Sequence, residues 1–222
     1  MNAPVAGGSL DLRLIVITDS ALARPRSVID VVQRALAAGA PAIQVRDKSA
    51  TSRELLALAD AVLPAVRAHG ALLFVNDRVD IAILAGADGA HLGPEDLPVG
   101  AARAIVPPAF LLGCSADDPD VARQAERDGA SYIGCGAVFG TSTKQEAALE
   151  RIGLARLDEV AGAVRIPVVG IGGIDAGNIA GIGATRAAGA AVVSAVMAAP
   201  EPGAAVRALL DGFARGRQRG AA

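Results

Sequence analysis

Residues 118–136, DPDVARQAERDGASYIGCG, contain a helix followed by a strand, with Gly129-Ala130 at the junction. Glycine directly after a helix end supplies the left-handed backbone conformation that caps the helix. The segment Tyr132–Gly136 is a short, β-rich run of the kind that forms a parallel strand buried on both faces. The stretch therefore predicts one α/β unit.

The same unit recurs along the chain, because Gly-Ala also stands at 39–40, 70–71, 86–87 and 189–190. The predicted strands are Leu12–Thr18, Ala42–Arg46, Leu72–Asn76, Gly89–Leu92, Phe110–Ser115, Tyr132–Gly136, Val168–Gly170 and Ala191–Ser194. The predicted helices lie near 26–38, 52–69, 78–85, 99–105, 118–128, 150–163, 175–187 and 203–215. This strict alternation predicts an α/β fold, a single-domain (β/α)8 TIM barrel. A doubly wound open sheet is the alternative, but it usually has fewer strands, and no G-x-G-x-x-G follows the first strand.

Composition limits the class of function. The 222 residues are 52% hydrophobic with a net charge of −2, which suits one domain over 1–222. We expect a loose leader over about 1–10 and a frayed tail over about 216–222. No basic field favours nucleic acid or an anionic membrane, and no apolar run is long enough to span a bilayer. We expect a cytoplasmic protein with small-molecule ligands. Cys114 and Cys135 are expected to be buried thiols. Whether the protein forms a homo-oligomer stays an open question.

Lysine is rare in this chain: only Lys48 and Lys144 occur among 21 basic residues. An ammonium group is a compact point charge on a flexible stem, suited to following a phosphate or a leaving group. Lys48 ends the sequence QVRDK at 44–48, where alternation places Gln44, Arg46 and Lys48 on the same side of the second strand. These side chains predict an anion site at the mouth of the barrel.

Two carboxylates follow neighbouring strands, at Asp77 and Asp96. Mg²⁺ usually takes one or two carboxylates and completes its shell with water and substrate phosphate, so the pair predicts a Mg²⁺ site. Two alternatives stay open: Asp77 caps the helix that starts at Arg78, and Glu95 replaces Asp96 as the second ligand.

No residue stands out as a general base. Ser115 ends the fifth strand without a nearby Asp–His pair and is interpreted as a hydrogen-bond donor. His69 is expected at the surface of a helix end, and His91 is expected to be a satisfied barrel residue. The chemistry is therefore one that needs no base.

A second anion site is predicted after strands seven and eight. Gly170–Ile174 reads GIGGI, and Val193-Ser194 ends the eighth strand. Loops at these two positions form the usual phosphate pocket of such barrels, where glycine lets the backbone approach the ligand. The loop GTSTK at 140–144 also suits an anion. A barrel that holds both anions at once would join two molecules and expel pyrophosphate.

The layout resembles the thiamine-phosphate synthase family. The motifs that carry the resemblance are QVRDK at 44–48, NDRVDIAILAGADGAHLG at 76–93, EDLP at 95–98, GCS at 113–115, YIGCGAVFGTSTK at 132–144, GIGGI at 170–174 and VVSAV at 192–196. The resemblance implies a transferase of thiamine biosynthesis that condenses hydroxymethylpyrimidine pyrophosphate with hydroxyethylthiazole phosphate. It also implies a carbocation at the pyrimidine methylene, which the thiazole nitrogen attacks with a lone pair.

The resemblance assigns roles by motif position. Implied ligands of the pyrimidine pyrophosphate are Gln44, Val45, Arg46, Asp47, Lys48, Asn76, Ser115 and Lys144. Implied ligands of the thiazole phosphate are Thr141, Ser142, Thr143, Gly173, Val193 and Ser194. Asp77 and Asp96 would hold Mg²⁺, and the implied catalytic residues are Arg46, Lys48, Ser115 and Lys144.

The sequence departs from the family pattern at Ile15, Pro94, Asp117, Ala137 and Gly140, and none of these removes an implied ligand. Two other functions stay open. A thiazole tautomerase of the same barrel family would keep the phosphate site of strands seven and eight, and would want a catalytic histidine. A non-catalytic phosphate-ligand sensor would bind both ligands without releasing pyrophosphate.

Overall fold

Eight parallel strands close into a barrel in chain order, with the eighth strand paired to the first. This computed structural model describes residues 10–140 and 151–220, so the leader expected at about 1–10 lies almost wholly outside the described residues. The strands are β1 (Leu14–Ile17), β2 (Ala42–Val45), β3 (Leu72–Asn76), β4 (Gly89–Leu92), β5 (Leu111–Ser115), β6 (Tyr132–Gly136), β7 (Val168–Ile171) and β8 (Gly189–Val192). The predicted (β/α)8 barrel is confirmed, and the open sheet is wrong.

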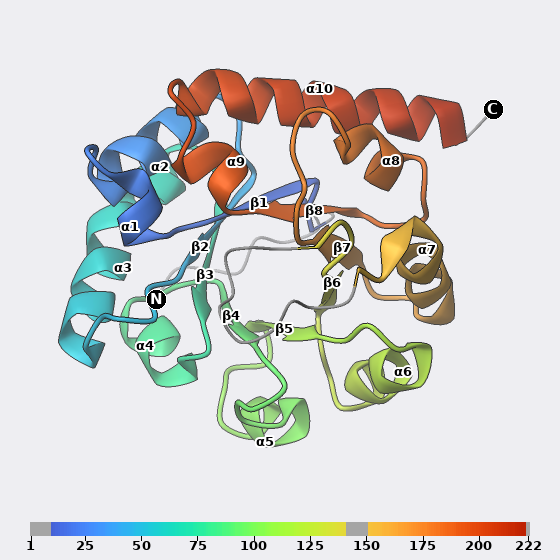
Figure 1. The fold of residues 1–222 in the computed structure, drawn as a ribbon. Coiled ribbons are helices and arrows are strands. Elements are labelled where there is room, and N and C mark those ends of the chain that lie inside the picture. The colour runs from blue at the N-terminus through green and yellow to red at the C-terminus, as the bar shows by residue number, and fades with distance from the viewer. Residues whose placement is uncertain (1–9, 141–150, 221–222) are drawn as a thin grey trace.

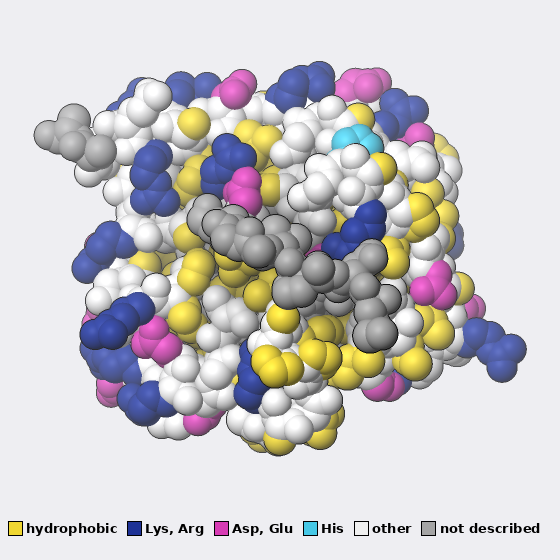
Figure 2. Space-filling view, turned by 180° about the vertical axis from the view of Figure 1, so that it is seen from behind, with side chains coloured by type: hydrophobic (Ala, Val, Ile, Leu, Met, Phe, Trp, Pro, Cys, Tyr) yellow, Lys and Arg dark blue, Asp and Glu magenta, His cyan; other side chains and the backbone are white. Residues whose placement is uncertain are grey.

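Helices form a ring outside the strands (Figure 1). Their bounds are α1 (Ser20–Ala23), α2 (Val28–Ala37), α3 (Ser52–Ala68), α4 (Val79–Leu84), α5 (Val99–Arg103), α6 (Pro119–Arg127), α7 (Gly153–Ala163), α8 (Ile179–Gly183), α9 (Ser194–Met197) and α10 (Pro202–Gly220). No helix of the described residues combines the length and apolar character needed to cross a membrane. On the face in Figure 2, basic side chains are interspersed with acidic and apolar ones and do not gather into one visible patch.

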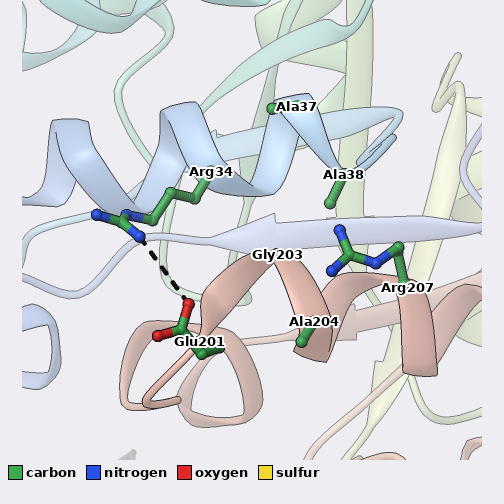
Figure 3. A pocket seen from close by; sticks show the side chains of 7 residues that line it. All are labelled: Arg34, Ala37, Ala38, Glu201, Gly203, Ala204 and Arg207. Carbon is green, nitrogen blue, oxygen red and sulfur yellow. Dashed lines mark ion pairs between the residues drawn. The ribbon is translucent and has the colours of Figure 1, made fainter.

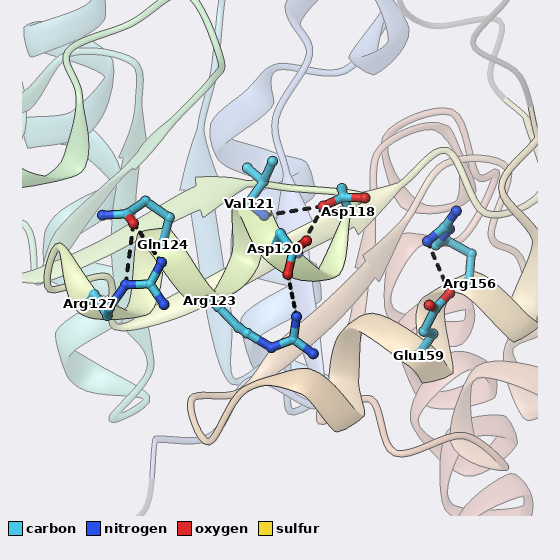
Figure 4. Close-up of polar contacts among 8 residues, drawn as sticks. All are labelled: Asp118, Asp120, Val121, Arg123, Gln124, Arg127, Arg156 and Glu159. Atoms are coloured by element: carbon cyan, nitrogen blue, oxygen red, sulfur yellow. Dashed lines mark hydrogen bonds and ion pairs between the residues drawn. The ribbon is translucent and has the colours of Figure 1, made fainter.

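The unit at 118–136 forms as predicted. The Asp118 carboxylate caps α6 by accepting hydrogen bonds from the Asp120 and Val121 amides at 2.8 and 3.3 Å. Figure 4 shows this cap beside the ion pairs on the outer surfaces of α6 and α7. Gly129 follows the helix with φ at 96°, and β6 starts at Tyr132. Helix end, glycine and strand therefore have the predicted order.

Several predicted boundaries differ from those of the structure. Strand β8 starts at Gly189 and ends at Val192. Only glycine fits at its first position, because an added Cβ would lie 1.7 Å from the Leu12 carbonyl oxygen in the segment before β1. Ser194 consequently begins α9 and does not end a strand. Helix α8 is shorter than predicted, because the Asp175 carboxylate holds a turn by accepting from the Gly177 amide at 2.8 Å.

The expected frayed tail is wrong for residues 216–220, which continue α10. Gly216 lets α10 approach α8, because a Cβ there would lie 2.0 Å from the Ala180 carbonyl oxygen. Arg217 donates hydrogen bonds to the carbonyl oxygens of Thr185 and Ala187. These tertiary contacts keep the last turns helical.

The barrel has two buried layers. One lies between the strands and the helices, and the other fills the barrel interior with Leu12, Ile15, Ile17, Ala42, Phe74, Tyr132, Val169 and Ala191. Both cysteines are buried free thiols, as predicted. Burial raises the pKa of Cys135 to about 12 and that of Cys114 to about 11, so neither thiol is poised for reaction.

Candidate active site

The polar end of β2 is anchored by a buried threonine. Thr18 is fully buried, and its hydroxyl accepts a hydrogen bond from the Arg46 amide at 2.8 Å and donates one to the Arg46 carbonyl at 3.0 Å. Gln44 is only 3% exposed, two positions beyond Ala42 of the interior layer. Thr18 therefore fixes the backbone from which Arg46 projects. No sequence motif marked Thr18 as part of the site, although it directly follows the apolar residues of the first strand.

Two residues of the QVRDK motif use their side chains within the fold. Val45 is fully buried in the layer between strands and helices, so only its backbone can reach a ligand. The Asp47 carboxylate accepts hydrogen bonds from the hydroxyls of Ser20 at 2.5 Å and Ser49 at 2.7 Å. Asp47 thus shapes the loop that presents Lys48.

The ends of β2, β3 and β4 bring two carboxylates and a lysine together. The Lys48 ammonium donates to the Asp77 carboxylate at 2.6 Å, and the carboxyl groups of Asp77 and Asp96 line the same groove and shift each other's pKa. Asp96 also accepts from the Gly93 amide at 2.6 Å, whereas Glu95 is exposed. Asp96 is therefore the partner of Asp77, and the Glu95 alternative is not supported.

Asp77 does not cap a helix. The position before α4 is Arg78, which makes no side-chain capping bond, so the capping alternative is wrong. Asp77 adopts φ of 64°, which aspartate tolerates better than most side chains do, while its amide donates to the His91 carbonyl at 2.7 Å. Strained backbone of this kind clusters at functional sites.

The two carboxyl groups are shifted in opposite directions. Burial acts to raise the pKa of Asp77, but hydrogen bonds with Lys48 and Asp96 outweigh it and hold that pKa below its usual value. Burial and the hydrogen bond with Asp77 raise the pKa of Asp96. Arg46 also lowers the pKa of Asp77 by its charge. Asp77 therefore holds its negative charge more strongly than Asp96 does.

The donor set fits a magnesium ion that is completed by substrate. The described residues contain no cluster of three or more histidine, cysteine, aspartate or glutamate side chains suited to a metal. Two carboxylates alone suit Mg²⁺, which keeps several waters and takes the rest of its shell from phosphate oxygens.

Ser115 belongs to a hydrogen-bonded row of side chains. Its hydroxyl lies 3.1 Å from Nε2 of His91, and Nδ1 of His91 lies 3.0 Å from the Tyr132 hydroxyl. His91 is thus a satisfied barrel residue, as predicted. His69 is exposed at the end of α3, also as predicted. Tyr132 was missed, although it is the one tyrosine of the chain.

The backbone after β7 and β8 forms a second polar region. Gly172 and Gly173 have φ of 98° and 65°, and the Gly173 carbonyl accepts from the Asn178 side chain at 2.8 Å. Ile171 pairs with Ala191 across β7 and β8, so Gly173 and Ser194 follow neighbouring strands. Ser194 is exposed and Val193 is half-buried. Thr141, Ser142, Thr143 and Lys144 lie outside the described residues.

We expect Gly173→Val to weaken binding of both substrates. A Cβ at Gly173 would lie 2.5 Å from the Gly140 carbonyl oxygen, so the substitution pushes on the segment after β6 as well as on the glycine turn. Calorimetric titration of each substrate checks this, with Ser194→Ala as the comparison that removes only an exposed hydroxyl. Loss of thiazole phosphate binding alone in Gly173→Val would contradict the expectation.

Two grooves lie on the surface of the described residues. One, of about 350 Å³, lies between α2 and α10, where Arg34 reaches Glu201 at 4.0 Å and Arg207 faces Ala38 (Figure 3). The other, of about 380 Å³, is lined by Asp77 and Asp96 on one side and by apolar side chains such as Leu97 and Ile105 on the other. Only the second groove touches the carboxylate cluster.

Known proteins share both the sequence and the fold. The family model described as thiamine monophosphate synthase matches residues 14–196. A thiamine-phosphate synthase of Roseiflexus castenholzii is 50% identical, over 88% of this chain and 86% of its own length. One from Methanoculleus marisnigri is 45% identical, over 93% and 98%. The solved thiamine phosphate pyrophosphorylase of Pyrococcus furiosus superposes with a TM-score of 0.84 at 39% identity, over 93% of this chain and 98% of that one. The chain belongs to the thiamine monophosphate synthase family.

Proposed function

We propose that this chain condenses hydroxymethylpyrimidine pyrophosphate with hydroxyethylthiazole phosphate, releasing pyrophosphate and thiamine phosphate at the carboxyl ends of its strands. Family membership makes it a transferase of the thiamine-phosphate synthase type. The observation that carries the proposal is the 2.6 Å contact of Lys48 with Asp77, which shares a groove with Asp96. A site with paired carboxylates and two cations suits a pyrophosphate with its metal ion.

The residues divide the work. Lys48 and Arg46 stabilise negative charge on the departing pyrophosphate, and Ser115 donates a hydrogen bond to it. Asp77 and Asp96 would hold Mg²⁺, which when bound adds positive charge against the leaving group. The backbone at Gly173 and the Ser194 hydroxyl hold the thiazole phosphate, and Asn76 and Gln44 orient the pyrimidine. Thr141, Ser142 and Thr143 are assigned to the thiazole phosphate and Lys144 to the pyrophosphate by sequence alone.

The reaction needs no general base. The attacking thiazole nitrogen uses a lone pair and carries no proton. The aminopyrimidine stabilises positive charge at its methylene after the carbon–oxygen bond to pyrophosphate breaks. The one histidine of the barrel interior bonds to Ser115 and Tyr132, as expected for a side chain with a structural task.

We expect pyrophosphate release only when both substrates and Mg²⁺ are present. The assay follows pyrophosphate and thiamine phosphate together, in the presence of Mg²⁺ and again in excess chelator. Full turnover in chelator would contradict the metal assignment. Conversion of the thiazole phosphate alone would indicate a tautomerase, and binding of both ligands without product would indicate a sensor.

The small-molecule ligands follow from the family. The metal ion, a cytoplasmic location, the absence of nucleic-acid and membrane partners and a homo-oligomeric state stay predictions of the sequence. Sedimentation of the purified chain tests the last of these.

A further inference from the structure

Three interior side chains connect the strands β4, β5 and β6. Tyr132 is 1% exposed, and its hydroxyl lies 3.0 Å from Nδ1 of His91. Nε2 of His91 lies 3.1 Å from the Ser115 hydroxyl at the end of β5. The row therefore runs from the buried interior to the strand end where Ser115 meets the ligand.

Two glycines make room for this row. A Cβ at Gly113 would lie 2.2 Å from Cζ of Tyr132, and a Cβ at Gly134 would lie 2.9 Å from Cε1 of His91. Both glycines belong to strands whose neighbouring positions carry side chains. A side chain at Gly113 or Gly134 would fill the space that the rings of Tyr132 and His91 occupy. The two glycines therefore allow the rings to pack where they do.

The row has a direction. Tyr132 keeps its proton, because burial raises the pKa of the phenol. The phenol is buried, so its hydrogen needs an acceptor, and Nδ1 of His91 lies 3.0 Å from the phenol oxygen. The phenol hydrogen therefore points to Nδ1 of His91. His91 then carries its own hydrogen on Nε2 and donates it to Ser115. The single hydrogen of Ser115 is left to point toward the strand ends.

We propose that Tyr132 and His91 are positioning residues that set the direction of the Ser115 hydroxyl, so that it donates to an oxygen of the departing pyrophosphate. The proposal rests on the proposed function, in which Ser115 touches that group. Neither Tyr132 nor His91 contacts the reacting atoms. Both act through the hydroxyl that they orient.

Tyr132→Phe tests the proposal by removing one oxygen from a buried ring. Without the phenol donor, the hydrogen of His91 is no longer directed to Nε2, and Nε2 becomes able to accept the hydrogen of Ser115. We expect kcat to fall about tenfold, less than the ~10²–10³-fold typical of deleting a donor to a transition state. Inhibition by inorganic pyrophosphate should weaken, while KM for the thiazole phosphate stays unchanged.

A double-mutant cycle with Ser115→Ala separates orientation from damage. Once the hydroxyl is gone, Tyr132→Phe should cause no further loss of kcat, because it acts only through that hydroxyl. Additive losses would overturn the proposal and make Tyr132 a packing residue. If Ser115→Ala alone keeps parental kcat, the role of Ser115 in the proposed site fails as well.

His91 provides a second test that does not depend on Tyr132. His91→Gln keeps an acceptor for the phenol and a donor for Ser115, so its kcat should stay within about threefold of the parent, less than the ~10²–10⁴-fold loss typical of removing an acid–base group. His91→Leu keeps the bulk and loses both bonds, and should match Tyr132→Phe. The same changes at exposed His69 are the controls. Equal kcat for His91→Gln and His91→Leu, with both folded by circular dichroism, would overturn the proposal.

Discussion

Asp77→Asn is expected to lower turnover by on the order of 10²–10³-fold, the range for loss of one strong transition-state contact. The change removes a charge from the carboxylate pair and replaces the charged acceptor of the Lys48 ammonium, which lies 2.6 Å away, with a neutral amide. Asparagine also tolerates positive φ, so the backbone at 64° is retained and the fold should stay intact. The loss therefore reports on the site.

A Mg²⁺ titration of the rate identifies the cause. Asp77→Asn should need a higher Mg²⁺ concentration for half-maximal activity, because one anionic ligand is lost. Asp80→Asn is the matched control, since Asp80 is an exposed carboxylate three positions along that pairs with Arg78. An unchanged Mg²⁺ requirement in Asp77→Asn would remove that residue from the metal site.

Lys48→Met is expected to lower turnover by on the order of 10²-fold with the binding of thiazole phosphate unchanged. Methionine keeps the length of the stem and loses the charge that faces the pyrophosphate. The pKa of Asp77 should also rise, because the Lys48 hydrogen bond is a cause of its depression. Single-turnover kinetics with calorimetry of each substrate measure both effects.

Arg78→Met is the control for this change, because Arg78 follows the neighbouring strand β3 and pairs with the exposed Asp80. Equal losses of turnover in Lys48→Met and Arg78→Met would mean that turnover depends on the total positive charge near the strand ends and not on the specific contact of Lys48. A loss confined to thiazole phosphate binding would place Lys48 at the other anion site.

Local chemistry explains why much of the fold could be predicted. The glycine junctions and the short apolar runs are set by neighbouring residues, so β3, β4 and β6 begin and end where the sequence places them. The errors arise where a distant backbone intervenes. Position 189 of β8 must be glycine because the Leu12 carbonyl oxygen lies against it. Helix α10 continues to Gly220 because it packs closely on α8.

The sequence by itself determined the order of strands and helices and the placement of polar residues just past strand ends, since periodicity and turn chemistry are local properties. Only the closed barrel decided which of those residues meet. Thr18 holds Arg46 across 28 positions, Lys48 reaches Asp77 across 29, and Tyr132 meets His91 across 41. Such contacts depend on strand register and on the space left by Gly113 and Gly134, and sequence spacing carries neither quantity.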